Sequence, residues 1–172
     1  TLKWKWQDEF KKHFNVDACV VSGSKEDRQA IWTQLPSQFI ICNYELLVRD
    51  WDVMPHEWNA IVADEAVYLK NPKALRTKKA KKLKSEARFA LSGIYIETSL
   101  MEFQAIMEWV RPEIVPSAYA FKYRYCEVNE YTKKITGYTD KIQELHVLTS
   151  PFILRRTKKE VLHDLPPKMP PD

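Results

Sequence analysis

Four short runs of apolar, largely β-branched residues are spaced along the first half of the chain. They cover residues 18–21, 38–42, 60–64 and 88–92. Continuous apolar runs of this length are typical of strands that are buried on both faces of a parallel sheet. Because helical patterns fall between these runs, the spacing predicts an α/β fold with a parallel sheet flanked by helices.

The helices between these strands are predicted from the period of their apolar positions. In the opening helix such positions recur at every fourth residue and share one face: Leu2, Trp6, Phe10 and Phe14. Three further helices are predicted at residues 25–35, 44–51 and 73–84.

The strand pattern stops after Ser92. The sequence Ser99-Leu-Met-Glu102 is typical of a capping box that opens another helix, and from there to Leu165 we find helical or irregular patterns only. The last seven residues hold four prolines, which indicates an extended tail or linker. We therefore predict three parts: a sheet-bearing part at 1–96, an all-helical part at 97–165 and a Pro-rich tail at 166–172.

Composition narrows the class of protein. The 172 residues are 45% hydrophobic and 29% charged, which is ordinary for a globular domain with one sizeable core. The longest apolar runs are too short to span a bilayer, so we expect no membrane partner. Three widely spaced cysteines without a CxxC pair argue against structural zinc and favour a reducing, intracellular compartment, nuclear in a eukaryote or cytoplasmic in a prokaryote.

Positive charge is concentrated in one segment. Between Lys70 and Arg88 the chain has nine Lys or Arg residues and a single acid, Glu86. Two interpretations stay open: a solvated basic helix face, or a stripe that contacts nucleic-acid phosphates. The stripe's candidate contacts are Arg76, Lys79 and Lys82.

The segment Asn59-Ala-Ile-Val-Ala-Asp-Glu-Ala66 has the pattern of a Walker B strand. A rigid strand presents Asp64 at the carboxyl edge of the sheet, where ligands of open α/β sheets bind. Mg²⁺ prefers oxygen ligands such as this carboxylate, and the adjacent Glu65 is suited to orient or deprotonate a water. The alternative is an acidic helix start, since Asp and Glu also favour first turns.

Several motifs in a fixed order resemble the Swi/Snf family of double-stranded-DNA translocases, within helicase superfamily two. The acidic motif continues as Asp64-Glu-Ala-Val-Tyr-Leu-Lys-Asn-Pro72 and is followed by Phe89-Ala-Leu-Ser-Gly93. The sequence SPFILRRTKKEVLHDLPPK occupies residues 150–168. Residues 2–10 are similar to the segment after the family's first motif, and residues 41–47 to its motif Ib. The similarity covers nearly the whole chain and is weakest at 127–136.

The resemblance implies an ATP-driven motor of two RecA-like lobes that tracks along duplex DNA. This chain would cover most of the first lobe, as a partial RecA-like sheet, together with the helical protrusion that follows. ATP and Mg²⁺ are the cofactors expected for the parent family. The expected partners are double-stranded DNA and the second motor lobe.

The resemblance also assigns roles to individual positions. Asp64 would coordinate Mg²⁺ and Glu65 would serve the hydrolytic water. Four residues would lie near DNA or on the path between DNA and nucleotide: Asn43, Tyr44, Lys70 and Asn71. Ser92 and Gly93 of motif III would couple the two sites. Arg155 and Arg156 match a basic pair near the second lobe, although such a pair is equally suited to clamp carboxylates.

The phosphate-binding loop of such motors has no counterpart in these 172 residues. The chain has three glycines, Gly23, Gly93 and Gly137, and none lies in a GxxxxGK[ST] context. Ser22-Gly-Ser24 follows a predicted strand but lacks the lysine, so we interpret it as a plain turn. We therefore expect that the chain alone binds no ATP and is inactive, although the parent family hydrolyses ATP.

Other departures lie on the nucleotide side. Val67 stands where the family usually has His, and a valine side chain forms no hydrogen bond. After motif III the family's Thr, Pro and Asn are replaced, while Glu97 is kept; the replacements are Ile94, Tyr95 and Thr98. Two explanations stay open: loss of catalysis in a retained lobe, or re-facing of a fragment with an exposed edge.

Three functional hypotheses follow. The chain is a fragment of a translocase motor, completed by the phosphate-binding segment and the second lobe. Alternatively, it is a non-catalytic module that binds DNA or protein, or a self-associating structural protein derived from such a lobe. Self-association is expected because a sheet that lacks a strand has an unpaired edge, and exposed edges pair with other chains.

Overall fold

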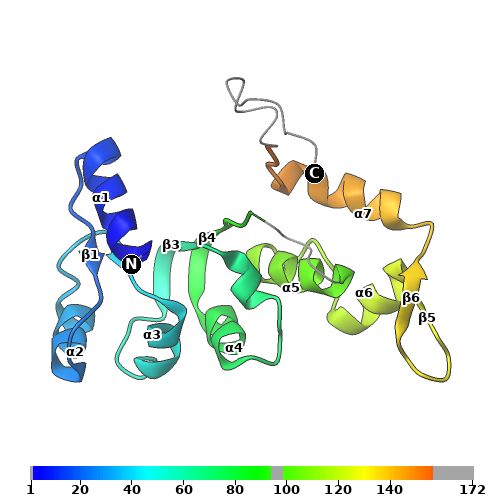
Figure 1. Cartoon of the computed structure of the whole chain (residues 1–172), viewed down its shortest axis with the longest axis horizontal. Helices are drawn as coiled ribbons and strands as arrows, with labels where there is room; N and C mark the ends of the chain where they lie inside the picture. The colour runs from blue at the N-terminus through cyan, green and yellow to red at the C-terminus, as the bar shows by residue number, and fades with distance from the viewer. Residues whose placement is uncertain (1, 94–98, 157–172) are drawn as a thin grey trace, which may run out of the picture. The chain divides into compact units, whose positions relative to one another are not determined.

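The computed structural model describes residues 2–93 and 99–156, which lie in two compact units, Thr1–Phe121 and Lys122–Asp172. Figure 1 shows the helices and strands of both units. No helix in the described part of the chain combines the length and the apolar character needed to cross a membrane.

The first unit has two parallel strand pairs, which confirms the predicted α/β class. Strand β1 (Cys19–Val20) pairs with β2 (Ile40–Ile41), and β3 (Glu57–Ala63) pairs with β4 (Lys84–Ala90). Among the described residues the two pairs are not hydrogen-bonded into one sheet. The strands β3 and β4 begin earlier than predicted, because Glu57 and Lys84 are partners in the register and form an ion pair of 2.6 Å.

The predicted helices of this unit are present with small shifts in their ends. They are α1 (Leu2–Phe14), α2 (Lys25–Gln34), α3 (Tyr44–Arg49) and α4 (Leu75–Lys82). A short 3₁₀ turn, η1 (Ala66–Leu69), follows β3. Helix α4 ends before the predicted residue 84, because the chain there already belongs to β4.

The apolar face predicted for α1 is only partly covered. Phe10 packs against Phe39 with ring centroids 4.7 Å apart, but Leu2 and Phe14 are exposed. No residue of α1 is fully buried. The helix lies over the short β1–β2 pair, and two strands of two residues each offer too little surface to bury four large side chains.

Helix α5 (Leu100–Val110) belongs to the first unit, which moves the boundary predicted at 96/97 to residue 121/122. It packs on β4 and η1. Trp109 is 1% exposed and donates its indole N–H to the Ala80 carbonyl at 3.1 Å, while Arg88 donates to the Trp109 carbonyl at 2.9 Å. The spacing of apolar residues predicted an apolar face on α5, but it could not show against which other elements this face packs.

The segment predicted to be all-helical contains a β-hairpin, so that prediction is wrong at residues 126–138. Helix α6 (Ala118–Tyr125) is followed by the antiparallel strands β5 (Cys126–Val128) and β6 (Ile135–Tyr138). The Asn129 side chain caps the turn by accepting hydrogen bonds from the backbone N–H groups of Tyr131 and Thr132. Strands this short have too few residues to show clear alternation.

After the hairpin the second unit is helical again, as predicted. It continues with α7 (Ile142–Thr149) and the short 3₁₀ turn η2 (Ser150–Phe152). Arg124 and Glu144 form an ion pair of 2.6 Å that joins α6 to α7. The predicted tail at 166–172 lies outside the described residues.

Candidate functional site

The acidic pair lies at the carboxyl end of β3, beside the end of β4. The β3–β4 ladder continues past both strands, since Leu91 N–H donates to the Ala63 carbonyl and Ala66 N–H donates to the Leu91 carbonyl, both at 2.8 Å. The structure therefore brings Asp64 and Glu65 to the same edge as the segment that enters Ser92 and Gly93. This is the edge at which parallel α/β sheets bind ligands.

Asp64 accepts hydrogen bonds from two other elements as well as from its own turn. The indole Nε1 of Trp6, on α1, donates to Asp64 Oδ2 at 2.7 Å. The backbone N–H of Glu65 donates to Oδ1 at 2.9 Å, and the hydroxyl of Tyr44 donates to the Asp64 carbonyl at 2.9 Å. Asp64 is partly buried, whereas Glu65 is exposed.

Sequence reasoning missed the contact of Trp6. Trp6 lies four residues before Phe10, and this spacing indicated a core position. Trp6 does pack against Phe10, with ring centroids 6.3 Å apart. The available signal was chemical: a partly buried indole N–H requires an acceptor. Residues 6 and 64 are far apart in sequence, so no local pattern identified which acceptor.

Tyr44 is an internal contact of this site rather than a free surface group. Burial raises the pKa of the Tyr44 hydroxyl, and the nearby Asp64 carboxylate raises it further. Its ring packs against Tyr68 with centroids 5.6 Å apart. The neighbouring Asn43 is exposed and caps α3, with Oδ1 accepting from Leu46 N–H at 3.3 Å. Their role towards DNA stays a prediction.

Arg76 is held at the same edge by Tyr68. Its Nε donates to the Tyr68 carbonyl at 2.8 Å, and its guanidinium lies 5.3 Å from the centre of the Tyr68 ring. A continuous set of contacts thus runs from Arg76 on α4 through Tyr68 and Tyr44 to Asp64.

Most cations of the basic segment have structural partners. Ion pairs join Lys70 to Glu102 at 3.4 Å, Lys81 to Glu108 at 2.8 Å, and Lys84 to Glu57. Two other cations are held without an ion pair in the described part of the chain. Arg88 is half-buried, and the loss of solvent there lowers the pKa of its guanidinium. The Lys79 ammonium lies 4.4 Å from the centre of the Trp51 ring.

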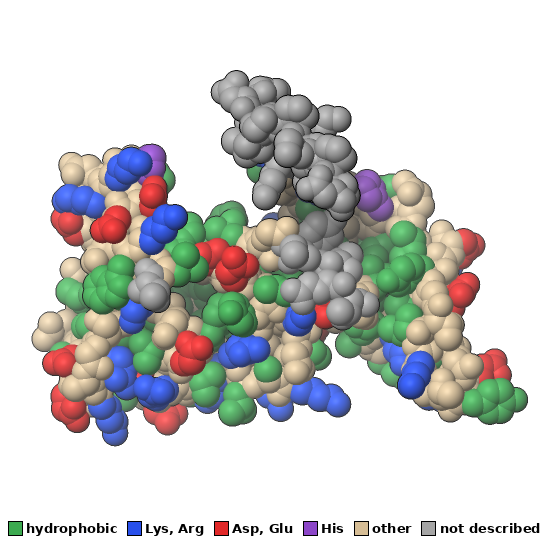
Figure 2. Space-filling view, in the orientation of Figure 1, with side chains coloured by type: hydrophobic (Ala, Val, Ile, Leu, Met, Phe, Trp, Pro, Cys, Tyr) green, Lys and Arg blue, Asp and Glu red, His purple; other side chains and the backbone are tan. Residues whose placement is uncertain are grey.

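Four lysines of the basic segment are exposed: Lys73, Lys78, Lys82 and Lys84. Lys84 is paired with Glu57, whereas the ammonium groups of the other three form no ion pair within the described residues. Lys and Arg side chains project along the lower edge of the first unit in Figure 2, where α4 lies. The predicted stripe is therefore narrower than the nine charges in the sequence suggested.

The turn at Ser22–Ser24 is the capped start of α2. Gly23 has φ +94°, and a Cβ there would lie 2.7 Å from Asp27 Oδ2. Ser24 and Asp27 form a reciprocal capping box: the Ser24 hydroxyl accepts from Asp27 N–H, and the Asp27 carboxylate accepts from Ser24 N–H. These hydrogen bonds lower the pKa of Asp27. The Asp27 carboxylate therefore fills this turn.

Other predicted positions are placed as follows. Val67 is half-buried in η1, and Asn71 accepts from Lys73 N–H at 2.9 Å through its side-chain Oδ1. Arg155 and Arg156 are exposed in the second unit. The remaining departures from the family pattern, with the retained acid, lie outside the described residues: Ile94, Tyr95, Glu97 and Thr98.

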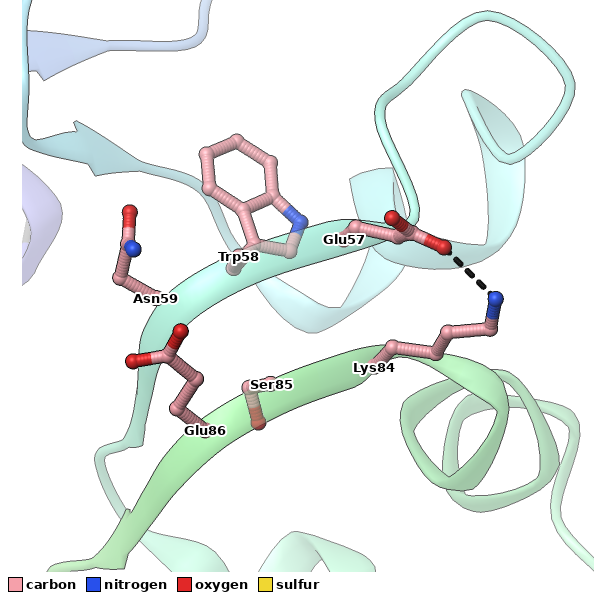
Figure 3. A pocket seen from close by; sticks show the side chains of 6 residues that line it. All are labelled: Glu57, Trp58, Asn59, Lys84, Ser85 and Glu86. Atoms are coloured by element: carbon pink, nitrogen blue, oxygen red, sulfur yellow. Dashed lines mark hydrogen bonds and ion pairs between the residues drawn. The ribbon is translucent and has the colours of Figure 1, made fainter.

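A hollow of about 430 Å³ lies at the opposite, amino end of β3 and β4 (Figure 3). It contains no predicted site residue and is lined by Glu57, Trp58, Asn59, Lys84, Ser85 and Glu86. The exposed Glu57–Lys84 ion pair lies at one end of it. In the described part of the chain no three His, Cys, Asp or Glu side chains gather as a metal site.

Comparisons with known proteins agree with the fold and the motifs. The sequence profile of the SNF2-related domain matches residues 1–170. The TATA-binding protein-associated factor mot1 of Aspergillus fumigatus is 31% identical over 98% of this chain and 10% of mot1. An uncharacterized ATP-dependent helicase of Mycoplasma genitalium is 30% identical over 98% of this chain and 16% of that helicase.

The solved SWI2/SNF2 ATPase core of Sulfolobus solfataricus in complex with dsDNA matches with a TM-score of 0.76 and 33% identity. The match covers 95% of this chain and 34% of the solved one. The same organism's SWI2/SNF2 ATPase core domain matches with a TM-score of 0.58 and 28% identity. The chain thus spans only a small part of the length of mot1 and of the Mycoplasma helicase.

Proposed function

Since the chain belongs to the SNF2-related domain family, we propose that it forms part of the first motor lobe of an ATP-dependent translocase on double-stranded DNA. The observation that carries this proposal is the placement of Asp64 and Glu65. They lie at the carboxyl edge of a parallel strand pair, where the chain of motif III also arrives.

The residues present fit one side of a Mg²⁺–ATP site. The Asp64 carboxylate would hold the metal and Glu65 would face the hydrolytic water, and bound Mg²⁺–ATP supplies the phosphoanhydride that is hydrolysed. The phosphate side is not supplied by these 172 residues, because none of their three glycines lies in a GxxxxGK[ST] context. We propose that the chain needs a separate phosphate-binding segment to hydrolyse ATP.

The surface proposed for duplex DNA is the exposed side of α4. Lys78 and Lys82 lie one turn apart on this helix, and Arg76 and Lys79 are held in place by aromatic rings. Charges held in this way lose little side-chain freedom on meeting a phosphate. Contacts with phosphates alone bind DNA without preference for sequence.

Two titrations test the proposal. Fluorescence anisotropy with a labelled duplex should show binding whose affinity falls steeply as the salt concentration rises. The reason is that binding of the protein releases counterions from the DNA phosphates, and added salt opposes this release. Isothermal titration with Mg²⁺–ATP should show no binding to the chain alone, and binding when a segment with a GxxxxGK[ST] phosphate-binding loop is supplied. Absence of DNA binding at low salt would contradict the DNA-side proposal, and tight binding of ATP to the chain alone would contradict the nucleotide-side one.

A second candidate function is self-association. Val62 and Phe89 are partners in the β3–β4 register, and these two residues are 56% and 54% exposed. Parallel sheets are usually covered on both faces, so a neighbouring apolar pair of this kind favours contact with another chain. A monomeric mass at high concentration in light scattering would exclude it.

A further inference from the structure

We infer that Trp6 and Tyr44 are positioning residues for Asp64: together they set the direction of its carboxylate and of the peptide that follows it. The inference rests on the proposed function only in giving Asp64 a role at the motor's nucleotide side. The contacts themselves are independent of that role.

The carboxylate is held through both of its oxygens. Trp6 Nε1 donates to Oδ2 at 2.7 Å, from a helix 58 residues away in sequence, and Glu65 N–H donates to Oδ1 at 2.9 Å. Hydrogen bonds to a charged acceptor are short and strong, and two donors from different directions select one rotamer. Each oxygen keeps a further lone pair for a ligand at the sheet edge.

Helix α1, which carries Trp6, is hydrogen-bonded to the segment that contains β1. On either side of Trp6 along α1, Lys3 donates through Nζ to the Val21 carbonyl at 3.0 Å, and Gln7 donates through Nε2 to the Ala18 carbonyl at 2.7 Å. These two bonds fasten α1 to the β1 segment. The indole N–H therefore reaches Asp64 from a helix whose orientation is already determined.

Tyr44 holds the backbone at the same place. The peptide that joins Asp64 to Glu65 is fixed at both polar atoms, because its carbonyl accepts from the Tyr44 hydroxyl and its N–H donates to Asp64 Oδ1. The next residue, Glu65, adopts φ 47°. A non-glycine residue in this left-handed region is strained and persists only where its surroundings hold it. The Tyr44 hydroxyl is one such restraint.

Two variants remove the donors while retaining aromatic rings. Trp6→Phe keeps a ring beside Phe10 but has no indole N–H. Tyr44→Phe keeps the ring against Tyr68 but has no hydroxyl. Matched controls are Trp4→Phe and Tyr131→Phe, at residues that are 45% and 94% exposed and whose side chains donate no hydrogen bond to Asp64 in the described part of the chain.

The readout is NMR of the chain without DNA or nucleotide. Three-bond couplings report the χ1 rotamer of Asp64, and the indole ¹H–¹⁵N signals report each Trp. We expect a single Asp64 rotamer in the wild type and in both controls, and loss of it to averaging in Trp6→Phe and in Tyr44→Phe. Asp64→Asn should shift the Trp6 indole signal. The buried Trp109 indole signal, unchanged, shows that each variant is folded.

An Asp64 rotamer that stays single in both variants would overturn the inference, as would an unmoved Trp6 signal in Asp64→Asn. If Trp6→Phe does not fold, Tyr44→Phe and Asp64→Asn still decide the question. Because no DNA is in the sample, a failed DNA titration leaves this result unchanged, and the two failures are distinguishable.

Discussion

Arg28 and Asp50 form a bidentate ion pair in the core of the first unit. Arg28 Nε lies 2.8 Å from Asp50 Oδ2, and its NH2 nitrogen lies 2.9 Å from Oδ1. Their side chains are 9% and 5% exposed, and the Trp32 indole N–H also donates to Asp50 at 3.2 Å. This pair joins α2 to the end of α3, so it holds the β1–β2 half of the unit to the rest.

Removal of Arg28 should therefore destabilise the chain strongly. Arg28→Ala leaves the Asp50 carboxylate buried without its guanidinium, and breaking a buried pair in this way costs about 3–5 kcal/mol. Chemical denaturation measures the change in the free energy of unfolding. The control is Lys11→Ala, which removes an exposed pair with Asp17 and should cost less than about 1 kcal/mol. A loss of similar size in both variants would contradict this prediction.

The same pair predicts how stability depends on pH. Hydrogen bonds from Arg28 lower the pKa of Asp50 in the folded state. Stability from this group is fully present above the unfolded pKa of about 3.9, and it is lost as pH falls through the lower, folded value. Denaturation midpoints of the wild type and of Asp50→Asn should be measured between neutral pH and about pH 3. The difference between the two midpoints should decrease as the pH falls. A constant difference at every pH would argue against it.

DNA binding should depend on the exposed lysines of α4. Lys78→Ala combined with Lys82→Ala removes two phosphate contacts, so the slope of log affinity against log salt should become shallower by about 2. Affinity should fall for all duplex sequences alike. The control is Glu57→Ala with Lys84→Ala, which removes an exposed ion pair between β3 and β4 and leaves the net charge unchanged. Equal slopes in the lysine variant and the wild type would exclude α4 as the DNA surface.

The turn before α2 should tolerate no side chain. Gly23→Ala places a Cβ against the Asp27 carboxylate at a residue with φ +94°, and such strain costs about 1–3 kcal/mol. Gly93→Ala is the control, since a Cβ there meets nothing within 4 Å. Thermal unfolding of both variants should show a lower midpoint for Gly23→Ala alone. Equal midpoints for the two variants would contradict the strain assigned to Gly23.

Self-association should depend on the exposed apolar pair of β3 and β4. Phe89→Ser removes the larger side chain from the face that it shares with Val62. We expect the mass measured by light scattering at high concentration to fall towards that of a monomer. Tyr131→Ser, at a hairpin residue that is 94% exposed, is the control and should leave the mass unchanged. An unchanged mass in Phe89→Ser would show that another surface joins the chains.

Much of the fold could be predicted because it depends on local pattern. The apolar runs identified all four strands of the first unit, and the Asp64–Glu65 pair was placed at a strand end. The β5–β6 hairpin escaped prediction, because its strands of three and four residues are held by the Asn129 turn and not by a visible period. Helix α5 was found, but its membership of the first core was not.

The sequence by itself determined the family, the order of its motifs and the position of the acidic pair, since each is written in consecutive residues. Only the tertiary structure decided which groups meet: that Trp6 reaches Asp64, that the Tyr44 hydroxyl bonds the Asp64 carbonyl, and that three cations of the basic segment form ion pairs. The physical reason is that hydrogen bonds and ion pairs act over about 3 Å. Whether two residues come that close depends on how the whole chain folds. No local sequence pattern around residues 6 and 64 indicates that they are in contact.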